Sequence, residues 1–291
     1  MKLKHFYELV VKFGSEYDPR KEKKSIKSYA DSAVLYGDLD TDVKKVMVGI
    51  DMEIGEILLA DKIRSASGLD LVISHHPEGR AYALLPEVMR LQVDMLKASG
   101  ITSGVALKLV EERMLEASRR LLPQNLTRAV DAARLVDIPF MCMHTPADNH
   151  VSVFLTKLMQ ARKPKKVKEI INILLDIPEY KNAARDTFTG PRIVSGSPNR
   201  NAGKVIFEMT GGTEGPRGAL EKLYKAGVRT VVSMHISEDH LKKAREVGLN
   251  IVIAGHISSD SLGLNLLLDR IEKEEELEVI SCAGFKRIKR I

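Results

Sequence analysis

Apolar positions along the chain alternate between short continuous runs and helical spacing. Residues 46–50 form a β-branched apolar run, residues 54, 57 and 58 share one helix face, and residues 69–73 form a second run. The same pattern returns with predicted strands at 205–209, 228–233 and 249–254 and predicted helices at 217–226 and 238–247. Strands that alternate with helical crossovers indicate the α/β fold class with parallel pairing.

Helical spacing also predicts a first helix at residues 3–13, two or three packed helices within 84–137, a helix at 167–175 and a closing helix around 264–271. Residues 140–143 form a further apolar run, and residues 189–203, rich in Gly, Pro and Asn, are predicted to form a loop. In the first half, a helical segment joins the apolar runs VMVGID and DLVISHH, and in the second half a helical segment joins RTVVSMH and NIVIAGH. This shared order indicates an internal pseudo-repeat. We therefore expect two lobes, residues 1–137 with a helical insertion and residues 138–291.

The composition limits the class of protein and the kind of metal ligand. A chain of 291 residues, 44% of them hydrophobic, suffices for two packed domains. It has no apolar run of ~18 residues and no signal-peptide pattern at its start, so we expect a cytoplasmic protein without a membrane partner. Only Cys142 and Cys282 are present, which excludes a clustered thiolate site. Any bound metal must therefore rest on nitrogen and oxygen ligands.

The net charge of +6 favours an anionic partner only weakly. Basic runs at residues 20–24, 162–168 and 286–290 lie beside loop signals or at the chain end, and no nucleic-acid-reading motif accompanies them. Solvated loops explain these runs better than a nucleic-acid surface does. Nucleic acid is therefore not an expected partner.

Four of the eight histidines, His75, His76, His144 and His256, follow predicted strands. The carboxyl ends of parallel strands share one edge of a sheet, where open α/β sheets build their sites. One histidine at a strand end is more often structural, but three separate strand ends favour a metal site. In an extended chain, His75 and His76 point in different directions, which suits two neighbouring ions.

A two-metal centre needs carboxylate ligands, and the aspartates nearest these histidines are Asp148 and Asp260. His256 and Asp260 are four residues apart, so both side chains can converge over the first turn of the closing helix. A helix-capping role for Asp260 is the alternative. Residues 210–215, a glycine-rich turn between a strand and a helix, could cradle an anion, but a plain turn is favoured.

The segments GIDM at 49–52, DLVISHHP at 70–77, HTPAD at 144–148 and AGHISSD at 254–260 resemble, in this order, the Nif-three family. The family is also called the GTP cyclohydrolase I type two family, or the Nif3-like dinuclear metal centre proteins. The resemblance spans about residues 30–270. It implies two similar α/β lobes with the metal site between them, commonly assembled into a toroidal hexamer. The metal ligands that it implies are His75, His76, Asp148, His256 and Asp260, holding two divalent ions such as Zn, Fe, Mn or Co.

The resemblance also marks His240 and His144 as candidates to act as a general acid or base, or to orient a metal ligand through a hydrogen bond. A plain surface role is the alternative for His240. His150 and His235 are weaker candidates. The chain departs from the family pattern in residues 83–137, which are longer and more helical than usual. It also has Asp260 where glutamate is usual, so the bridging ligand is shorter by one methylene.

A dinuclear site of histidines and carboxylates suits metal-dependent hydrolysis. The resemblance points to a nucleotide-like or phosphate-bearing small molecule, and the GTP cyclohydrolase activity in the family name rests on resemblance alone. The alternative is a non-enzymatic metal-binding oligomer that serves as a scaffold or regulator. The same ligands and assembly would support either function.

Overall fold

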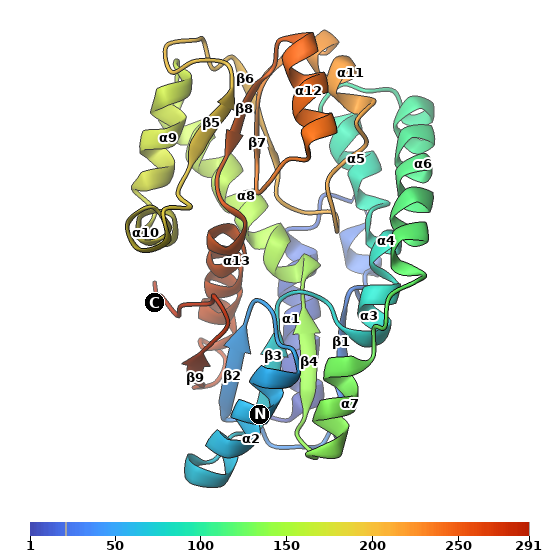
Figure 1. Ribbon diagram of the computed structural model, residues 1–291, viewed down its shortest axis with the longest axis vertical. Helices are drawn as coiled ribbons and strands as arrows, with labels where there is room; N and C mark the ends of the chain where they lie inside the picture. Colours follow the sequence, from blue (N-terminus) through green and yellow to red (C-terminus); the bar gives the residue numbers. More distant parts are fainter. Residues whose placement is uncertain (21, 291) are drawn as a thin grey trace.

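Two β-sheets occupy opposite ends of the molecule, and two long helices run between them (Figure 1). The computed structural model describes residues 1–20 and 22–290; Lys21, in the first basic run, and Ile291 lie outside the described residues. The helices between the sheets are α8 (Thr145–Arg162) and α13 (His256–Ile271). The mixed α/β class predicted from the sequence is confirmed.

The first sheet has the strand order β1-β4-β3-β2-β9. Its strands are β1 (Ser32–Tyr36), β2 (Lys45–Gly49), β3 (Leu71–Ser74), β4 (Phe140–Met143) and β9 (Glu278–Ser281). Only the β1–β4 pairing is antiparallel. Val46 and Val48 face the core under α1 (Leu3–Glu16) and α13, whereas Met47 faces α2 (Ile54–Ser67) and α7 (Arg128–Leu135). Apolar groups on both faces explain the continuous apolar run of β2.

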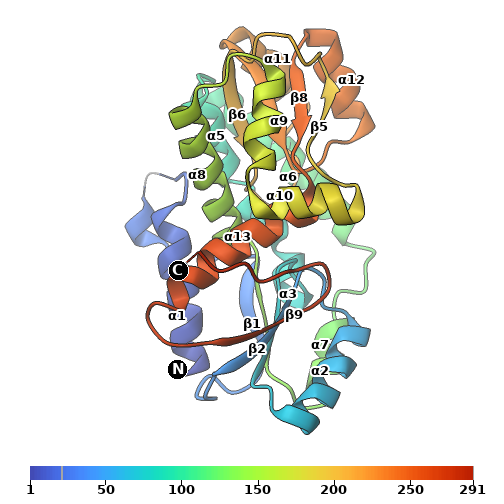
Figure 2. The same ribbon diagram turned by 90° about the vertical axis from the view of Figure 1, so that its left-hand side faces the viewer.

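The second sheet has the order β5-β8-β7-β6, with β5 antiparallel to β8 and the other pairs parallel. Its strands are β5 (Arg192–Ser195), β6 (Lys204–Glu208), β7 (Val228–Ser233) and β8 (Asn250–Ile253). One face packs on α8 and α9 (Val167–Leu175). The other packs on α5 (Leu91–Ala98), α6 (Ser103–Leu121), α11 (Ala219–Lys225) and α12 (Glu238–Val247) (Figure 2). In both sheets an antiparallel edge strand is followed by three parallel strands in reverse sequence order, β4-β3-β2 in the first sheet and β8-β7-β6 in the second.

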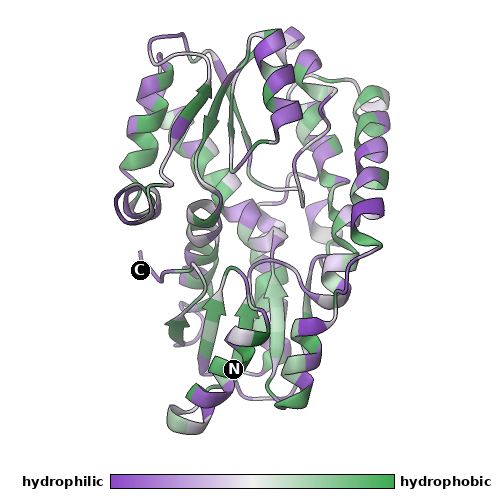
Figure 3. Cartoon of the chain, viewed as in Figure 1, coloured by the Kyte–Doolittle hydropathy of each residue, from purple (hydrophilic) through white to green (hydrophobic). Residues whose placement is uncertain are grey.

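Short helical segments complete the chain: α3 (Gly79–Ala83), α4 (Leu85–Val88), α10 (Pro178–Asn182) and single turns at Lys23–Ser25 and Ala183–Thr187. Apolar residues line the strands of both sheets, and polar residues lie on the outer helices and at the junction of the two sheets (Figure 3). No helix within residues 1–20 and 22–290 has the length and apolar character needed to cross a membrane.

Several elements differ from the sequence-based prediction, which did not include the strands β1 and β9. Residues 189–203, predicted as a loop, contain the edge strand β5. The helix α8 was not predicted, because its first turns bury the polar residues Asp148, Asn149 and His150 and so break the apolar period. The sheets also divide the chain differently from the expected boundary after residue 137, since β4 and β9 follow that residue but pair in the first sheet.

The helices α8 and α13 cross closely near their amino-terminal ends. A Cβ built on Gly263 of α13 would lie 2.5 Å from the carbonyl oxygen of Ala147 in α8 and 2.9 Å from its carbonyl carbon. A Cβ on Gly14 of α1 would lie 2.6 Å from Cβ of Pro146. Glycine is therefore required at both contacts, and the first turn of α8 is fixed between α1 and α13.

We expect Gly263→Ala to destabilise the protein by about 1–3 kcal/mol, because the added methyl group meets backbone atoms that cannot move independently. Gly104→Ala in α6 is the matched control, since a Cβ there has nothing within 4 Å. Alanine has the higher helix propensity, by up to ~1 kcal/mol, so the control should be neutral or stabilising. Denaturant unfolding of both variants measures the difference. Equal stability of Gly263→Ala and wild type would contradict the tight crossing.

A second prediction concerns His150, a buried residue of α8 whose Nδ1 lies 2.7 Å from the carbonyl oxygen of Pro146. Its ring packs edge-on against Tyr17. Burial lowers the pKa of His150 to about 4. The unfolded chain binds this proton near pH 6.5, so the stability contribution is complete above that pH and is lost as the pH falls toward 4.

The variant His150→Phe keeps an aromatic ring at this position but cannot titrate. Wild type should therefore lose ~3 kcal/mol more stability than His150→Phe between pH 6.5 and 4, as measured by urea unfolding across this range. Parallel stability profiles for the two proteins would show that His150 is not held neutral by burial.

Candidate metal centre

The first pair of site residues follows β3 and is held by the backbone of β2. The peptide N–H of His75 donates to the carbonyl of Gly49 at 2.8 Å, and that of His76 donates to the carbonyl of Ile50 at 2.9 Å. These bonds continue the parallel ladder beyond the end of β3, so both histidines have fixed backbones. The side chain of His75 is fully buried, whereas His76 is 25% exposed.

The other site residues lie where a strand passes directly into a long helix. After β4, His144 precedes the first turn of α8, which carries Asp148; after β8, His256 begins α13, which carries Asp260. Gly255, between β8 and α13, has φ 113°, a conformation that favours glycine. The spacing His-x-x-x-Asp therefore occurs at the same place after each sheet, and the α8–α13 crossing brings the two copies together.

The imidazole and carboxylate atoms of the five predicted ligands converge. His75 Nε2 lies 3.4 Å from Asp148 Oδ1 and 3.5 Å from Asp260 Oδ1. The other oxygen of Asp260, Oδ2, lies 3.4 Å from His76 Nε2 and 3.6 Å from His256 Nε2. His144 Nε2 lies 3.6 Å from Asp148 Oδ2. Donor atoms at about 2.1 Å from a tetrahedral ion are about 3.4 Å apart, so these spacings fit a divalent metal ion.

Several of these atoms are buried without a hydrogen-bond partner. They are both ring nitrogens of His75, both carboxylate oxygens of Asp260 and Oδ1 of Asp148. Buried polar atoms almost always have a partner, and an ion is a common one where none is seen. Two groupings meet the spacing for a shared ion, His75 with His144 and Asp148, and His75 with His76 and Asp260. The residues therefore fit a metal ion, and they are compatible with metal binding.

Two further aspartates orient the histidines from behind. Asp51, just beyond β2, lies 2.6 Å from Nδ1 of His76, and Asp31, just before β1, lies 2.7 Å from Nδ1 of His144. Asp31 also accepts a hydrogen bond from the hydroxyl of Thr145 at 2.6 Å. In both rings Nδ1 is occupied by a carboxylate, so Nε2 is directed at the cluster. The sequence-based prediction missed Asp31 and Asp51.

The buried aspartates of the cluster stabilise positive charge on neighbouring groups. Burial lowers the pKa of His75, but Asp260 and Asp148 outweigh it and raise that pKa to about 10. Burial likewise opposes protonation of His76, and Asp260 and Asp51 raise its pKa to about 9. Burial raises the pKa of Asp260, yet His75 and His76 hold it far below the usual range. The buried carboxylates must therefore be balanced by protonated histidines or by bound cations.

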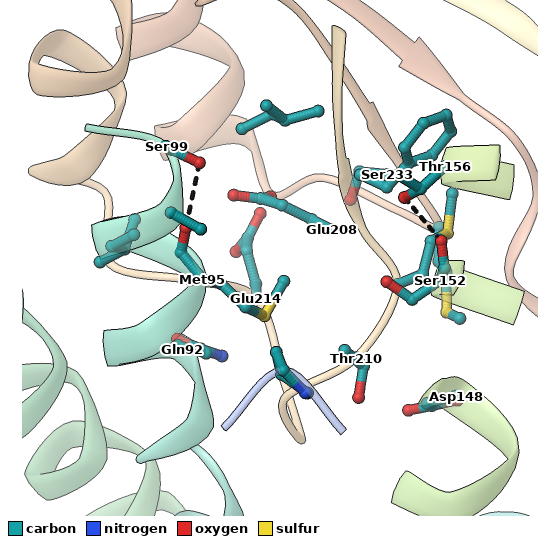
Figure 4. Close-up of a pocket in the computed structure, with 18 of the residues that line it drawn as sticks. Gln92, Met95, Ser99, Asp148, Ser152, Thr156, Glu208, Thr210, Glu214 and Ser233 are labelled. Atoms are coloured by element: carbon teal, nitrogen blue, oxygen red, sulfur yellow. Dashed lines mark hydrogen bonds between the residues drawn. The ribbon is translucent and has the colours of Figure 1, made fainter. Parts of the chain in front are cut away.

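A cavity of about 490 Å³ opens beside the cluster (Figure 4). Its wall includes His144, Asp148 and His256 at one end, together with Ser152 and Thr156 of α8. It continues between β6 and α5, where Glu208, Gln92 and the turn at residues 212–216 line it. A small molecule in this cavity could reach the cluster directly.

The structure separates the two predicted catalytic histidines. His144 joins the ligand cluster itself and lines the cavity. His240, on α12, is outside both groupings of possible ligands. Its Nδ1 lies 2.8 Å from the Ser237 hydroxyl and 3.1 Å from the Glu214 carboxylate. Its Nε2 lies 2.8 Å from the carbonyl oxygen of Gly215.

Of the weaker candidates, the ring of His235 lies 4.9 Å from that of His256 and lines the cavity. His150 is buried within α8 and outside the cavity wall.

The chain is similar to several solved structures over nearly its whole length. A NIF3 superfamily protein from Sphaerobacter thermophilus is 29% identical with a TM-score of 0.81, and the match covers 94% of this chain and 97% of that one. Reduced HcgD from Methanocaldococcus jannaschii is 18% identical with a TM-score of 0.58 and 97% coverage of both chains. A Bacillus cereus protein related to NIF3 is 11% identical with a TM-score of 0.50, covering 100% of this chain and 98% of that one.

The two more distant structures show the shared fold alone. No protein-family model and no curated protein matches the chain. The Sphaerobacter protein is a NIF3 superfamily protein, and this is the family that the strand-end motifs resemble. The structural match covers 94% of this chain. In its fold, this chain is similar over nearly its whole length to a NIF3 superfamily protein, which supports the Nif3-like resemblance of its strand-end motifs.

Proposed function

We propose that the protein holds two divalent metal ions and acts as a metal-dependent hydrolase on a nucleotide-like or phosphate-bearing small molecule. The observation that carries the proposal is the set of buried, unpartnered nitrogen and oxygen atoms of His75, Asp148 and Asp260 beside an open cavity. A structural metal site would be closed on all sides, whereas a catalytic site keeps access for substrate.

The arrangement of Asp260 supports two ions rather than one. Its Oδ1 faces His75, and its Oδ2 faces His76 and His256. A carboxylate that presents one oxygen to each of two ligand groups is the usual bridge in a dinuclear centre. Aspartate would then fill the bridging role in place of the glutamate usual in the family. His75, His144 and Asp148 would complete one ligand set, and His76 and His256 the other.

When bound, divalent ions in this site supply Lewis-acid activation of water and of a substrate oxygen. The chain itself contributes orientation, because Asp51 and Asp31 fix the rings of His76 and His144. The hydroxyl groups of Ser152 and Thr156, which line the cavity, can hydrogen-bond a polar substrate. His235, beside His256 on the cavity wall, is placed to exchange a proton with a bound substrate.

We propose a phosphate-bearing substrate because of the resemblance to the family. The His/Asp cluster at one end of the cavity supports this class, since metal ions bound there would attract an anionic group. A closed homo-oligomer, most simply a hexamer, is carried forward on the same resemblance. In our proposal, His240 acts on Glu214 and the adjoining turn rather than on the metal ligands, because its ring contacts Glu214 and Gly215.

We expect the purified chain to bind close to two equivalents of Zn, Mn, Fe or Co, because the six candidate ligands are too many for one tetrahedral ion. Elemental analysis after loading and desalting measures the ratio. Loaded protein should hydrolyse at least one member of a panel of nucleotides and phosphate esters, and a chelator should abolish the turnover. A ratio near zero would reject the metal centre, and two bound ions without turnover would favour the scaffold or regulator.

We expect Asp260→Asn to lose at least one ion and to lower metal affinity by ~10-fold to 100-fold, because an amide cannot neutralise two cations or offer two anionic oxygens. Asp176→Asn is the control, since Asp176 is 65% exposed and pairs only with Arg162 at the surface. That pair contributes little to stability.

Metal titration followed by calorimetry compares the two variants with wild type. Loss of metal affinity in Asp260→Asn alone would support the bridging role. Equal affinity in all three proteins would reject Asp260 as a metal ligand. The capping role considered from the sequence is not seen, because Gly255 is the N-cap residue and both carboxylate oxygens of Asp260 lack a hydrogen-bond partner in the part of the chain that the structure describes.

A further inference from the structure

The end of the cavity remote from the metal ligands carries two acceptor groups that the proposed hydrolysis does not use. One is the carboxylate of Glu208 at the end of β6, and the other is the side-chain amide of Gln92 in α5 (Figure 4). Within the described part of the chain, the Glu208 carboxylate has no hydrogen-bond or ion-pair partner. Its neighbour Glu214 is satisfied differently, by the N–H of Ser237 at 2.8 Å and by His240.

The orientation of the Gln92 amide is fixed by its surroundings. Its Nε2 donates to the carbonyl oxygens of Gly211 and Thr213 at 2.7 and 2.8 Å. Two carbonyl acceptors require the NH₂ group on that side, so Oε1 must face the other way. Gln92 is only 5% exposed, and its Oε1 is buried without a partner. An unsatisfied buried amide oxygen costs free energy unless a ligand or a water molecule supplies a donor.

Both acceptors converge on the space beside Gly215. A Cβ built on Gly215 would lie 3.5 Å from Oε1 of Glu208 and 3.8 Å from Oε1 of Gln92. These are ordinary van der Waals distances, and the φ of Gly215 is not in the left-handed region. The glycine therefore leaves open a space, bordered by one carboxylate and one amide oxygen, that a single methyl group would fill.

Charge also distinguishes this end of the cavity. Burial and the nearby charge of Glu214 raise the pKa of Glu208 to about 7. The ionised form of Glu208 is therefore disfavoured at this end of the cavity. A partner that donates hydrogen bonds and carries positive charge would stabilise this ionised form, whereas an anion would destabilise it further. Lys204, which also lines the cavity, instead donates to the carbonyl of Ser99 at 3.0 Å.

We propose that Glu208, Gln92 and Gly215 form a subsite for a planar group with two adjacent N–H donors, of the amidinium, guanidinium or amino-substituted heterocycle class. A carboxylate accepts such a pair in a bidentate manner, and the Gln92 oxygen accepts a further N–H. The inference extends the proposed function, since the substrate would present this group here and its reacting end to the metal ligands. It identifies the donor-rich end of the substrate.

The test uses benzamidine as probe, titrated by calorimetry into both the chelator-treated and the metal-loaded full chain at pH 7.5 and 0.15 M salt. We expect binding in the millimolar range in both states, because the subsite contains no metal ligand. Benzoate and phenyltrimethylammonium are the comparison probes. The first reverses the charge, and the second keeps a positive charge but has no N–H donor, so neither should bind.

Two variants and one control locate the binding. Glu208→Gln should weaken benzamidine binding at least tenfold by removing the charge, and Gly215→Ala should do the same by filling the space while both acceptors remain. Glu111→Gln, an exposed carboxylate of α6, should leave binding unchanged. Thermal melting of each variant checks the fold, and Glu208→Gln should melt no lower than wild type.

Equal binding of phenyltrimethylammonium, or unchanged benzamidine affinity in both Glu208→Gln and Gly215→Ala, would overturn the subsite. Absence of benzamidine binding to the folded wild type would do so as well. None of these results depends on metal loading or turnover. A failed metal centre and a failed amidine subsite can therefore be told apart.

Discussion

The close crossing of α8 and α13 is the constraint on which the site depends. Each helix begins directly after the strand that lies next to the antiparallel edge strand of a different sheet, and each carries an aspartate about one turn from its start. Because Gly263 lets the backbone of α13 approach Ala147, Asp148 and Asp260 both come within 3.5 Å of the same His75 nitrogen. Neither sheet alone contains this cluster. The two sheets are joined by the same helix contact that brings the acidic side chains together.

Much of the fold and most residues of the His/Asp cluster could be predicted from local signals. Apolar runs flanked by helical spacing identified β2, β3, β4, β6, β7 and β8, because strands buried on both faces have continuous apolar sequences. His75, His76 and His256 follow such runs directly, and the carboxyl ends of parallel strands share an edge. The four-residue spacing of His256 and Asp260 then placed the carboxylate over the same turn.

The remaining features depend on tertiary context. The edge strands β1 and β5 were not predicted: β1 (SAVLY) contains a short apolar run that offered a usable signal, whereas β5 (RIVS) has only two apolar residues. Asp31 precedes one of these strands, and its role becomes visible only when β1 pairs with β4 beside His144. Asp51 offered a usable signal, since it follows β2 at the same edge as the histidines. Glu208 and Gln92 are 116 positions apart in the sequence, and only the packing of α5 beside β6 brings them to one cavity.

The place of β9 has a consequence for the order in which the molecule assembles. This last strand pairs with β2, in a register that joins Lys45 to Glu278 and Val48 to Ser281. While the chain is being synthesised, β2 therefore remains an open edge until residues 278–281 have been made, and the first sheet closes after the second. The second sheet, whose four strands lie within residues 192–253, has no such delay. A nascent chain thus completes the strands of its second sheet before those of its first, the reverse of the usual vectorial order.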